Sequence, residues 1–317
     1  MSGGGWLGTF VSGWLFWFYF VSEKIKNRDA TLARLLDIRA GVLMTASCAR
    51  IEDNCMIKLK NIGDDEWVFE DSLVDLSTHD RLDDAIDLWH SGKPDKAESL
   101  IKDIIEKNPH HIDAYHHVSM IYQESGLDFE AYLCCREAVR IGLSAAPEEF
   151  LWTTSKMRWG HLENRPFLRA YHNLGLWLDK RNEINEAVEV FSNMLSVCPN
   201  DNIGVRYVLP KLWMEIGDLL SIVRLNKQYP DDYSPEFMYT HSLALIMLGE
   251  IEKARTLLDD AKAAFPLVAE ELKKKHHPKP KSSFSGGITV GGADQAYEYW
   301  KQYGKYWNNY EEAKSLL

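Results

Sequence analysis

One stretch, residues 166–202, constrains the fold most strongly, because it has the pattern of two short antiparallel helices closed by a proline. Leu174 and Leu178 are four residues apart, which places both side chains on one helical face. Gly175 and an alanine in the second helix are small enough for the two backbones to approach closely, and a phenylalanine fills the groove between them. Pro199 cannot continue the second helix. One hairpin cannot bury its own apolar face, so this pattern predicts neighbouring hairpins.

The same pattern recurs along the chain. Ala97 and Ala131 take equivalent positions and are 34 residues apart, and Ala187 and Ala254 are 67 apart, close to two such periods. The interval from Ala131 to Ala187 is 56 residues, which is longer than one period and predicts an insertion at residues 143–165. These spacings predict about five hairpins, of which the fourth is degenerate.

We therefore predict a mainly all-α protein, a right-handed α-solenoid of helix hairpins with a small non-repeat part before it and a capping helix after it. Tyr297, Trp300 and Gly304 form one stripe of that last helix, or helix pair. The predicted organisation is an apolar segment at 1–22, a non-repeat region at 23–76, the repeats at 77–271, a basic and glycine-rich linker at 272–292, and an aromatic helix at 293–317.

Two local features depart from the repeat pattern. Alternating apolar residues at Ile57, Leu59, Trp67 and Phe69 suggest a β-hairpin inside the non-repeat region, although a turn between helices is the alternative. Pro210 lies inside the expected first helix of the fourth unit, so it is predicted to kink or end that helix.

The repeats resemble the tetratricopeptide-repeat superfamily, whose template is W-x2-L-G-x2-Y, then A-x3-F, then P. Tyr171 stands in the Trp position, Leu178 in the Tyr position, and Ala187, Phe191 and Pro199 match the second half. The stretches PNDNIGVRYVLP, FPLVAEEL and AYEYWKQYGKYW are also similar to a bacterial group of tetratricopeptide proteins and to the suppression-of-tumorigenicity family. Neither resemblance implies a reaction.

The superfamily resemblance implies an array that binds a peptide or partner protein on the concave face, which the first helices of the repeats form. Repeat positions carried over to this chain give the partner-binding candidates Asp113, His116, Gln123, Glu124, Arg169, His172, Asp179, Lys180, Arg206 and Trp213. Arginine can bind a carboxylate through two N–H groups, and tryptophan often anchors interfaces. The alternative for each residue is an ordinary solvated helix face.

The resemblance also argues against one kind of partner. Members that bind chaperone tails use a Lys/Asn carboxylate clamp, but the matching positions of the first unit here hold Leu82 and Ile86. Binding of a chaperone C-terminus is therefore disfavoured.

Composition narrows the function further. A net charge of −11 argues against nucleic acid as the main partner, because phosphate binding needs a basic surface. The five cysteines are odd in number and lack metal-ligand spacing, which favours a reducing compartment. Histidines that are adjacent on a helix point about 100° apart, so we interpret four of them as structural and predict neither metal nor cofactor. They are His110, His111, His116 and His117.

These observations favour a non-enzymatic interaction scaffold, since the sequence has no G-x-S-x-G motif and no phosphate-binding loop. Two alternatives remain open. One is an enzyme or regulator whose site lies in residues 23–76, with the repeats recruiting its substrate. The other is a structural subunit of a larger complex.

The N-terminal run Trp6–Val21 is uncharged and rich in aromatic residues, but it is shorter than the roughly 20 residues that span a bilayer. Lys24, Lys26 and Arg28 follow it, which by the positive-inside rule would leave the rest of the chain cytoplasmic. The run is therefore either a membrane anchor or an apolar segment that packs against the first repeat or a partner. We expect a cytoplasmic protein, with membrane association through this run as the open question.

Overall fold

The computed structural model describes residues 57–72, 74, 76–280 and 287–317. The chain divides into two compact units, residues 1–55 and 56–317, and the described residues belong to the second unit. The apolar run Trp6–Val21 and residues 23–56 of the expected non-repeat region lie outside the described residues. Within the described part, no helix is both long enough and apolar enough to cross a membrane.

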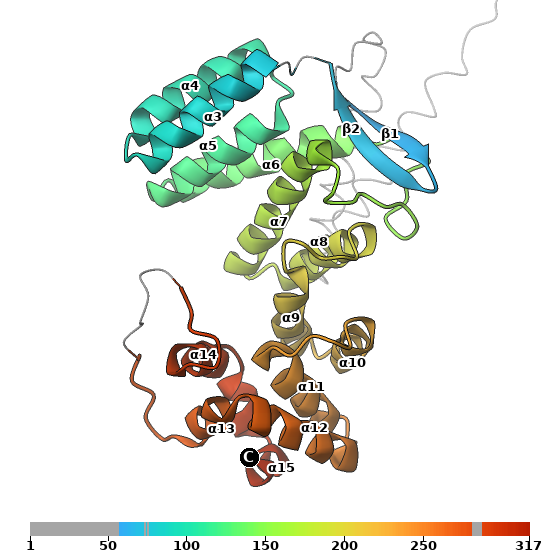
Figure 1. Ribbon diagram of the computed structural model, residues 1–317, viewed down its shortest axis with the longest axis vertical. Helices are drawn as coiled ribbons and strands as arrows, with labels where there is room; N and C mark the ends of the chain where they lie inside the picture. The colour runs from blue at the N-terminus through green and yellow to red at the C-terminus, as the bar shows by residue number, and fades with distance from the viewer. Residues whose placement is uncertain (1–56, 73, 75, 281–286) are drawn as a thin grey trace, which may run out of the picture. The chain divides into compact units, whose positions relative to one another are not determined.

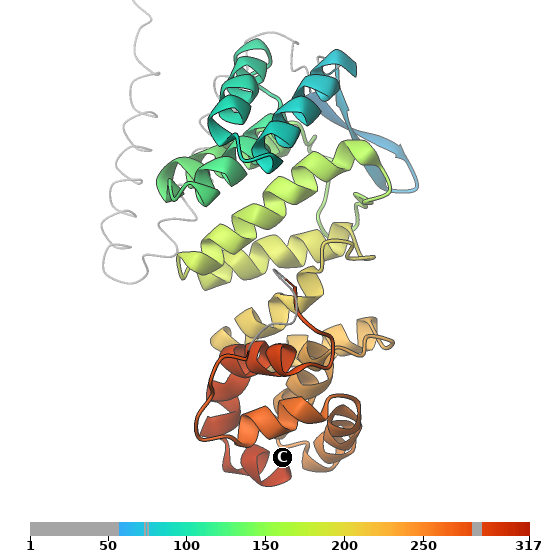
Figure 2. The same cartoon turned by 60° about the vertical axis from the view of Figure 1, so that its left-hand side comes forward.

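Five helix hairpins follow one another along the described chain, as Figure 1 and Figure 2 show. Each helix packs against the next, and the first helices of the second and third hairpins also contact each other directly. The hairpins are α3 (Leu76–His90) with α4 (Pro94–Lys107), α5 (Ile112–Glu124) with α6 (Asp128–Ser144), α7 (Arg165–Lys180) with α8 (Ile184–Val197), α9 (Leu209–Ile216) with α10 (Leu219–Gln228), and α11 (Pro235–Met247) with α12 (Ile251–Ala264). The predicted all-α array of tetratricopeptide-type hairpins is confirmed.

Close contact between the two helices of the third unit explains its small residues. A Cβ atom added at Gly175 would lie 2.5 Å from the Phe191 ring, so a larger residue cannot occupy this position without displacing that ring. Ala187 and Phe191 are fully buried, and Leu178 is nearly so. The spacing seen in the sequence is therefore the spacing of the interhelical contact.

A two-stranded antiparallel hairpin precedes the helices, formed by β1 (Ile57–Gly63) and β2 (Glu66–Asp71). Asp64 and Asp65 both have positive φ, the backbone conformation that a tight hairpin turn requires. The alternating apolar residues all face the core, and one of them, Phe69, packs its ring 5.3 Å from that of Phe167 in α7.

The insertion between α6 and α7 is a loop that ends in the short 3₁₀ helix η1 (Leu162–Asn164). Its backbone is tied on two sides, because Lys156 donates its N–H to the Asp65 carbonyl and Met157 donates to the Val197 carbonyl at the end of α8. Trp152 stacks on Tyr171 with ring centroids 5.1 Å apart. The inserted residues thus join the β-hairpin to the third unit.

The prediction for Pro210 was wrong. Pro210 neither kinks nor ends the first helix of the fourth unit but lies in the first turn of α9, which has only eight residues. Proline is tolerated there because its missing N–H would have no helical partner in any case. The residues before it form the separate 3₁₀ helix η2 (Val205–Tyr207).

Three further helices close the described chain: α13 (Pro266–Lys273), α14 (Ala293–Asn309) and α15 (Glu311–Leu316). Helix α14 packs on α13 and α11, and its Tyr299, Tyr303 and Trp307 side chains are almost fully buried. His277 stacks on Trp300 with ring centroids 3.7 Å apart. The stripe read from the sequence is not the buried face of α14, because Tyr297 and Trp300 are only half-buried, although Gly304 is buried.

Candidate functional site

Four of the predicted partner-binding residues lie together where α5 meets α7. Arg169 Nη2 donates to both carboxylate oxygens of Asp113, at 2.8 Å each, and His117 Nδ1 lies 3.4 Å from the same carboxylate. Burial alone would raise the pKa of Asp113, but the hydrogen bond from His117 and the charge of Arg169 hold that pKa well below its usual range. Asp113 is therefore a carboxylate fixed between two first helices.

The two imidazoles of this contact are packed as neutral groups. Burial, with the nearby charges of His117 and Arg169, lowers the pKa of His116 to about 3. Burial lowers the pKa of His172 to about 4, and its ring meets Phe191 edge-on at 5.5 Å. Neither imidazole carries a proton charge near neutral pH, so both act as core side chains rather than as cationic ligands.

The other predicted charges on α5 and α7 also bind within the chain. Lys211 Nζ donates to both Asp179 oxygens at 2.8 and 2.9 Å, which joins α7 to α9. Lys180 pairs with Asp128 of α6 at 2.6 Å, which joins α6 to α7. Glu124 accepts a hydrogen bond from the Trp89 indole of α3 at 2.8 Å, whereas the Gln123 side chain is exposed. Most of the predicted charges therefore hold neighbouring units together.

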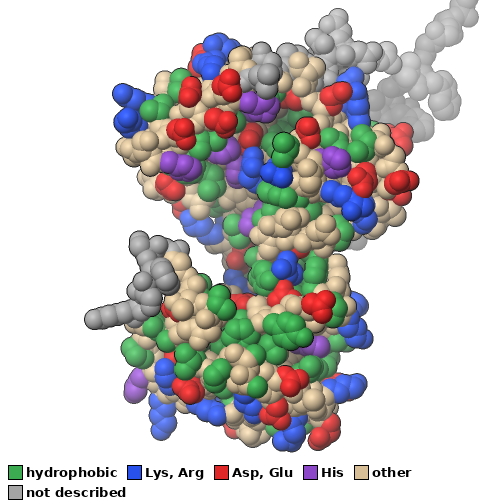
Figure 3. Space-filling model, in the orientation of Figure 1, with side chains coloured by type: hydrophobic (Ala, Val, Ile, Leu, Met, Phe, Trp, Pro, Cys, Tyr) green, Lys and Arg blue, Asp and Glu red, His purple; other side chains and the backbone are tan. Residues whose placement is uncertain are grey.

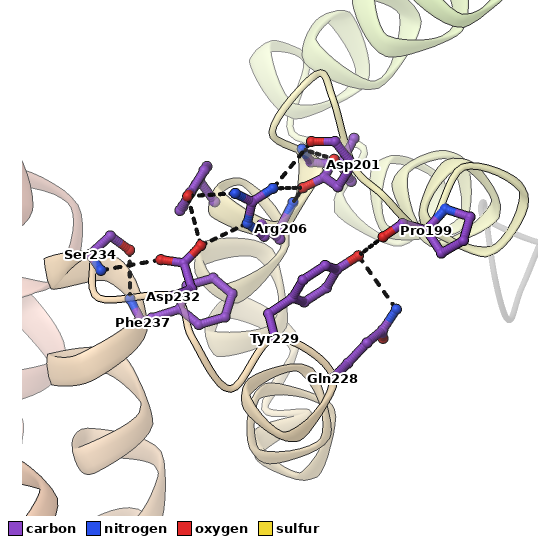
Figure 4. A network of polar contacts seen from close by, with 10 residues as sticks. Pro199, Asp201, Arg206, Gln228, Tyr229, Asp232, Ser234 and Phe237 are labelled. Atoms are coloured by element: carbon purple, nitrogen blue, oxygen red, sulfur yellow. Dashed lines mark hydrogen bonds and ion pairs between the residues drawn. The ribbon is translucent and has the colours of Figure 1, made fainter. Parts of the chain in front are cut away.

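Arg206 lies in η2 rather than on a first helix, and Figure 4 shows the polar network around it. Its guanidinium donates to Asp232 at 2.7 Å, to Asp201 at 3.0 Å and to the Tyr207 hydroxyl at 2.8 Å. The Asp201 carboxylate is almost fully buried and also accepts two backbone N–H groups of the η2 region. This network connects the loop that enters the fourth unit with the loop that enters the fifth.

Sequence reasoning found Arg206 but not its two carboxylates. Both lie in proline-bearing turns, PND at residues 199–201 and YPD at 229–231 with Asp232 next, where aspartate commonly binds local backbone groups. Those turns were the available signal for Asp201 and Asp232.

Trp213 is separated from the other candidates. Its indole is 8% exposed and lines a cavity between α8 and α10, which are the second helices of their units. Lys156 and Arg224 line the same cavity and were not predicted. The sequence signals that could have found them are the insertion, which contains Lys156, and the degenerate fourth unit, which contains Arg224.

Charges of both signs are mixed over the face of the molecule seen in Figure 3. Most of the histidines visible in that view lie over the first three units. Within the part of the chain that the structure describes, no group of three His, Cys, Asp or Glu side chains has the geometry to hold a metal ion. Cys134 and Cys135 are thiols whose pKa burial raises, to about 11 and about 12 respectively.

Comparison with known proteins gives one family and several solved structures. YrrB, described as a TPR protein with an unusual peptide-binding site, has a TM-score of 0.44 at 17% identity, covering 59% of this chain and 85% of its own. A tetratricopeptide repeat protein from Parabacteroides merdae has a TM-score of 0.44 at 14% identity, covering 61% and 68% respectively. MamA has a TM-score of 0.44 at 14% identity, covering 64% and 98%. A comparison with curated proteins finds no match.

The family model described as "Transcriptional repressor TCF25" matches residues 91–307. This match begins just after α3 and reaches into α14, so it takes in the array from α4, the second helix of the first hairpin, to the aromatic helix. Because it covers more than half of the 317 residues, the chain belongs to the family of the transcriptional repressor TCF25.

Proposed function

We propose that this chain is a protein-interaction scaffold that binds a peptide or partner protein along the face formed by the first helices α5, α7 and α9. The observation that supports this is the pair of ion bridges Asp113–Arg169 and Asp179–Lys211, which join these three helices in order. A surface held in fixed register before binding loses less conformational entropy when a partner docks. The first-helix face is therefore suited to recognition by many moderate contacts.

Arg169 is the residue of this face best placed to recognise a carboxylate on the partner. Its side chain is 34% exposed, and in the described contacts it binds Asp113 through Nη2 alone. The guanidinium presents several N–H donors in one plane, so Nη1 remains for a second acceptor. Gln123 adds an exposed amide on the neighbouring helix.

The family description names a transcriptional repressor, and we propose that a chain of this kind would act by contacting proteins rather than DNA. The net charge of −11 supports this choice, because DNA binding draws most of its affinity from basic residues on phosphates. The partner would then be a protein of the repression machinery.

Charge reversal on the first-helix face tests the proposal. Lys180→Glu on α7 is compared with Lys253→Glu on α12, since both lysines are exposed and each pairs with one surface carboxylate. Each full-length variant is tagged in native cells, and its partners are quantified by affinity purification and mass spectrometry. We expect Lys180→Glu, alone or with Gln123→Arg, to lose a defined set of partners that Lys253→Glu retains. Equal partner sets for all variants would contradict binding at this face.

We also propose that the run Trp6–Val21 contacts a membrane, on the strength of its uncharged aromatic composition and the basic residues after it. Flotation of the full chain with liposomes, beside a chain lacking residues 1–22, tests this. Loss of flotation in the shortened chain is the expected result, and equal behaviour of the two chains would refute membrane contact through this run.

A further inference from the structure

The two departures from the repeat pattern meet at one place in the structure. The fourth unit is short, with eight residues in α9 and ten in α10, whereas the helices of the other four units have 13 to 17. Beside this short unit lies a cavity of about 440 Å³ between α8 and α10. The insertion contributes one of the residues that line it, Lys156.

The floor of this cavity is apolar. Leu209 and Leu225 are fully or almost fully buried, and Leu195 and Trp213 are each 8% exposed. The indole and the leucines together give the cavity an apolar surface on which an apolar side chain can pack.

Two cations stand at the rim, and both are held in place. Lys156 is fixed through its backbone to the β-hairpin and by its Nζ, which donates to the Ser196 carbonyl at 2.9 Å. Arg224 Nη2 donates at 2.7 Å to the Ser221 hydroxyl, which in turn donates to Asp218 at 2.5 Å. Lys156 lies in the insertion loop and Arg224 lies in α10, and both side chains are held by hydrogen bonds before any ligand binds.

A hydrogen bond joins the ends of the two second helices beside the cavity. Tyr229 Oη donates to the Pro199 carbonyl at 2.7 Å, and Gln228 lies beside it, as Figure 4 shows. Pro199 and Gln228 both line the cavity.

The charge of the lining is opposite to that of the chain. Among residues 57–72, 74, 76–280 and 287–317, no Asp or Glu lines the cavity, and neither Lys156 nor Arg224 forms an ion pair with a carboxylate. In a chain of net charge −11 such a pair of cations is complementary to an anionic ligand. An apolar floor under a cationic rim suits a ligand that carries both an apolar group and an anionic group.

We propose that this cavity is a second binding site, distinct from the first-helix face, for an acidic peptide segment of a partner protein. A large apolar side chain of the segment packs on Trp213. An adjacent Asp or Glu side chain accepts hydrogen bonds from Lys156 and Arg224, which are charge-assisted and hence among the stronger polar contacts.

The test uses the full chain and short peptides that are acetylated and amidated, so that they carry no terminal charge. In the peptide panel one Glu and one Phe are placed at every spacing up to one helical turn in a Gly/Ser background, and binding is measured by fluorescence anisotropy. We expect at least one spacing to bind, and we expect Glu→Gln or Phe→Ser in that peptide to abolish binding. If no peptide of the panel binds, the site is not an acidic-peptide site.

Variants then locate the binding. Lys156→Gln and Arg224→Gln remove the charge but keep a hydrogen-bond donor for Ser196 and Ser221, so the fold is expected to persist, which circular dichroism checks. Each is expected to weaken binding about tenfold or more, the usual effect of losing a hydrogen bond to a charged group. Lys227→Gln serves as the control, because Lys227 is exposed and lies on α10 with Arg224 but does not line the cavity.

Two further results distinguish an acidic-peptide site in this cavity from a phosphate-binding site and from binding at the first-helix face. Arg224→Glu is expected to reverse the preference, so that a peptide with Lys in place of Glu binds more tightly than the original. The proposal is overturned if Lys156→Gln, Arg224→Gln, Arg224→Glu and the control Lys227→Gln all bind the peptide alike. It is also overturned if peptides bind only when their Glu is replaced by phosphoserine. The first-helix variant Lys180→Glu should leave peptide affinity unchanged, so failure at one site does not decide the other.

Discussion

Acidification is expected to destabilise the fold through the two histidines packed between α5 and α7. The pKa of His116 is lowered to about 3 and that of His172 to about 4, from 6.5 for an unperturbed histidine. Between those values the unfolded chain binds protons that the folded chain does not. The free energy of unfolding therefore falls as the pH drops below about 6.5, and the stabilisation is fully present above it.

The size of the effect follows from the two pKa values. A pH of about 5 is roughly 1.5 units below the pKa of an imidazole in the unfolded chain, so that imidazole is protonated, whereas the folded imidazole is still neutral. One pH unit of this difference corresponds to about 1.4 kcal/mol of unfolding free energy. Each histidine thus loses about 2 kcal/mol of stabilisation between roughly pH 7 and pH 5, and the two together lose about 4 kcal/mol. This is a large share of the 5–15 kcal/mol or so that is typical of folded domains.

The neighbouring groups do not change this sign. The carboxylate of Asp113, whose pKa is lowered, stays ionised throughout this pH range and loses its stabilising effect only at much lower pH. The acid effect between pH 7 and pH 5 therefore comes from imidazoles that are buried as neutral groups.

The assay is urea unfolding followed by circular dichroism at a series of pH values, because the slope of unfolding free energy against pH counts the protons taken up on unfolding. His116→Gln is expected to reduce that slope by about one proton between pH 5 and 6, or about 1.4 kcal/mol per pH unit. His276→Gln, a change at an exposed histidine, is the control and should leave the slope unchanged. An unchanged slope in His116→Gln would refute the claim that this imidazole is buried neutral.

Three further changes test the packing. Gly175→Ala places a methyl group against Phe191 and is expected to cost about 1–3 kcal/mol of unfolding free energy, measured by urea denaturation. Arg206→Leu leaves two buried carboxylates without their cation and is expected to cost about 3–5 kcal/mol, with Arg206→Lys losing less. His277→Ala removes the stack on Trp300 and is expected to speed limited proteolysis between residues 278 and 292, without changing cleavage elsewhere.

The helix hairpins were predictable because their contacts are local and repeat. Ala97, Ala131, Ala187 and Ala254 are all completely buried, since each is the small residue at which one helix crosses its hairpin partner. Because this steric requirement recurs in every hairpin, a small residue recurs in the sequence at a fixed period. The β-hairpin was readable for a similar reason, because alternation is the direct consequence of one buried strand face.

The candidate site was less readable, because its geometry depends on pairs far apart in sequence. The repeat template predicts which helix carries Arg169 or Asp179, but not that Arg169 meets Asp113 or that Asp179 meets Lys211. Charged side chains are long, and several partners are sterically open to each until the units are packed. Trp213 was assigned to the first-helix face from repeat positions alone, but in the shortened α9 its indole lines the cavity between α8 and α10.

The shortened fourth unit also explains why polar contacts gather around it. In a repeat array most stability comes from the interfaces between neighbouring units, so a unit with shorter helices contributes less apolar burial at both of its junctions. The insertion backbone bonded to the end of α8 reinforces one side, and the Asp201–Arg206–Asp232 network reinforces the loops on the other. The cavity thus lies beside a unit in which directed polar contacts replace part of the continuous core, and the mostly buried Trp213 is part of its lining.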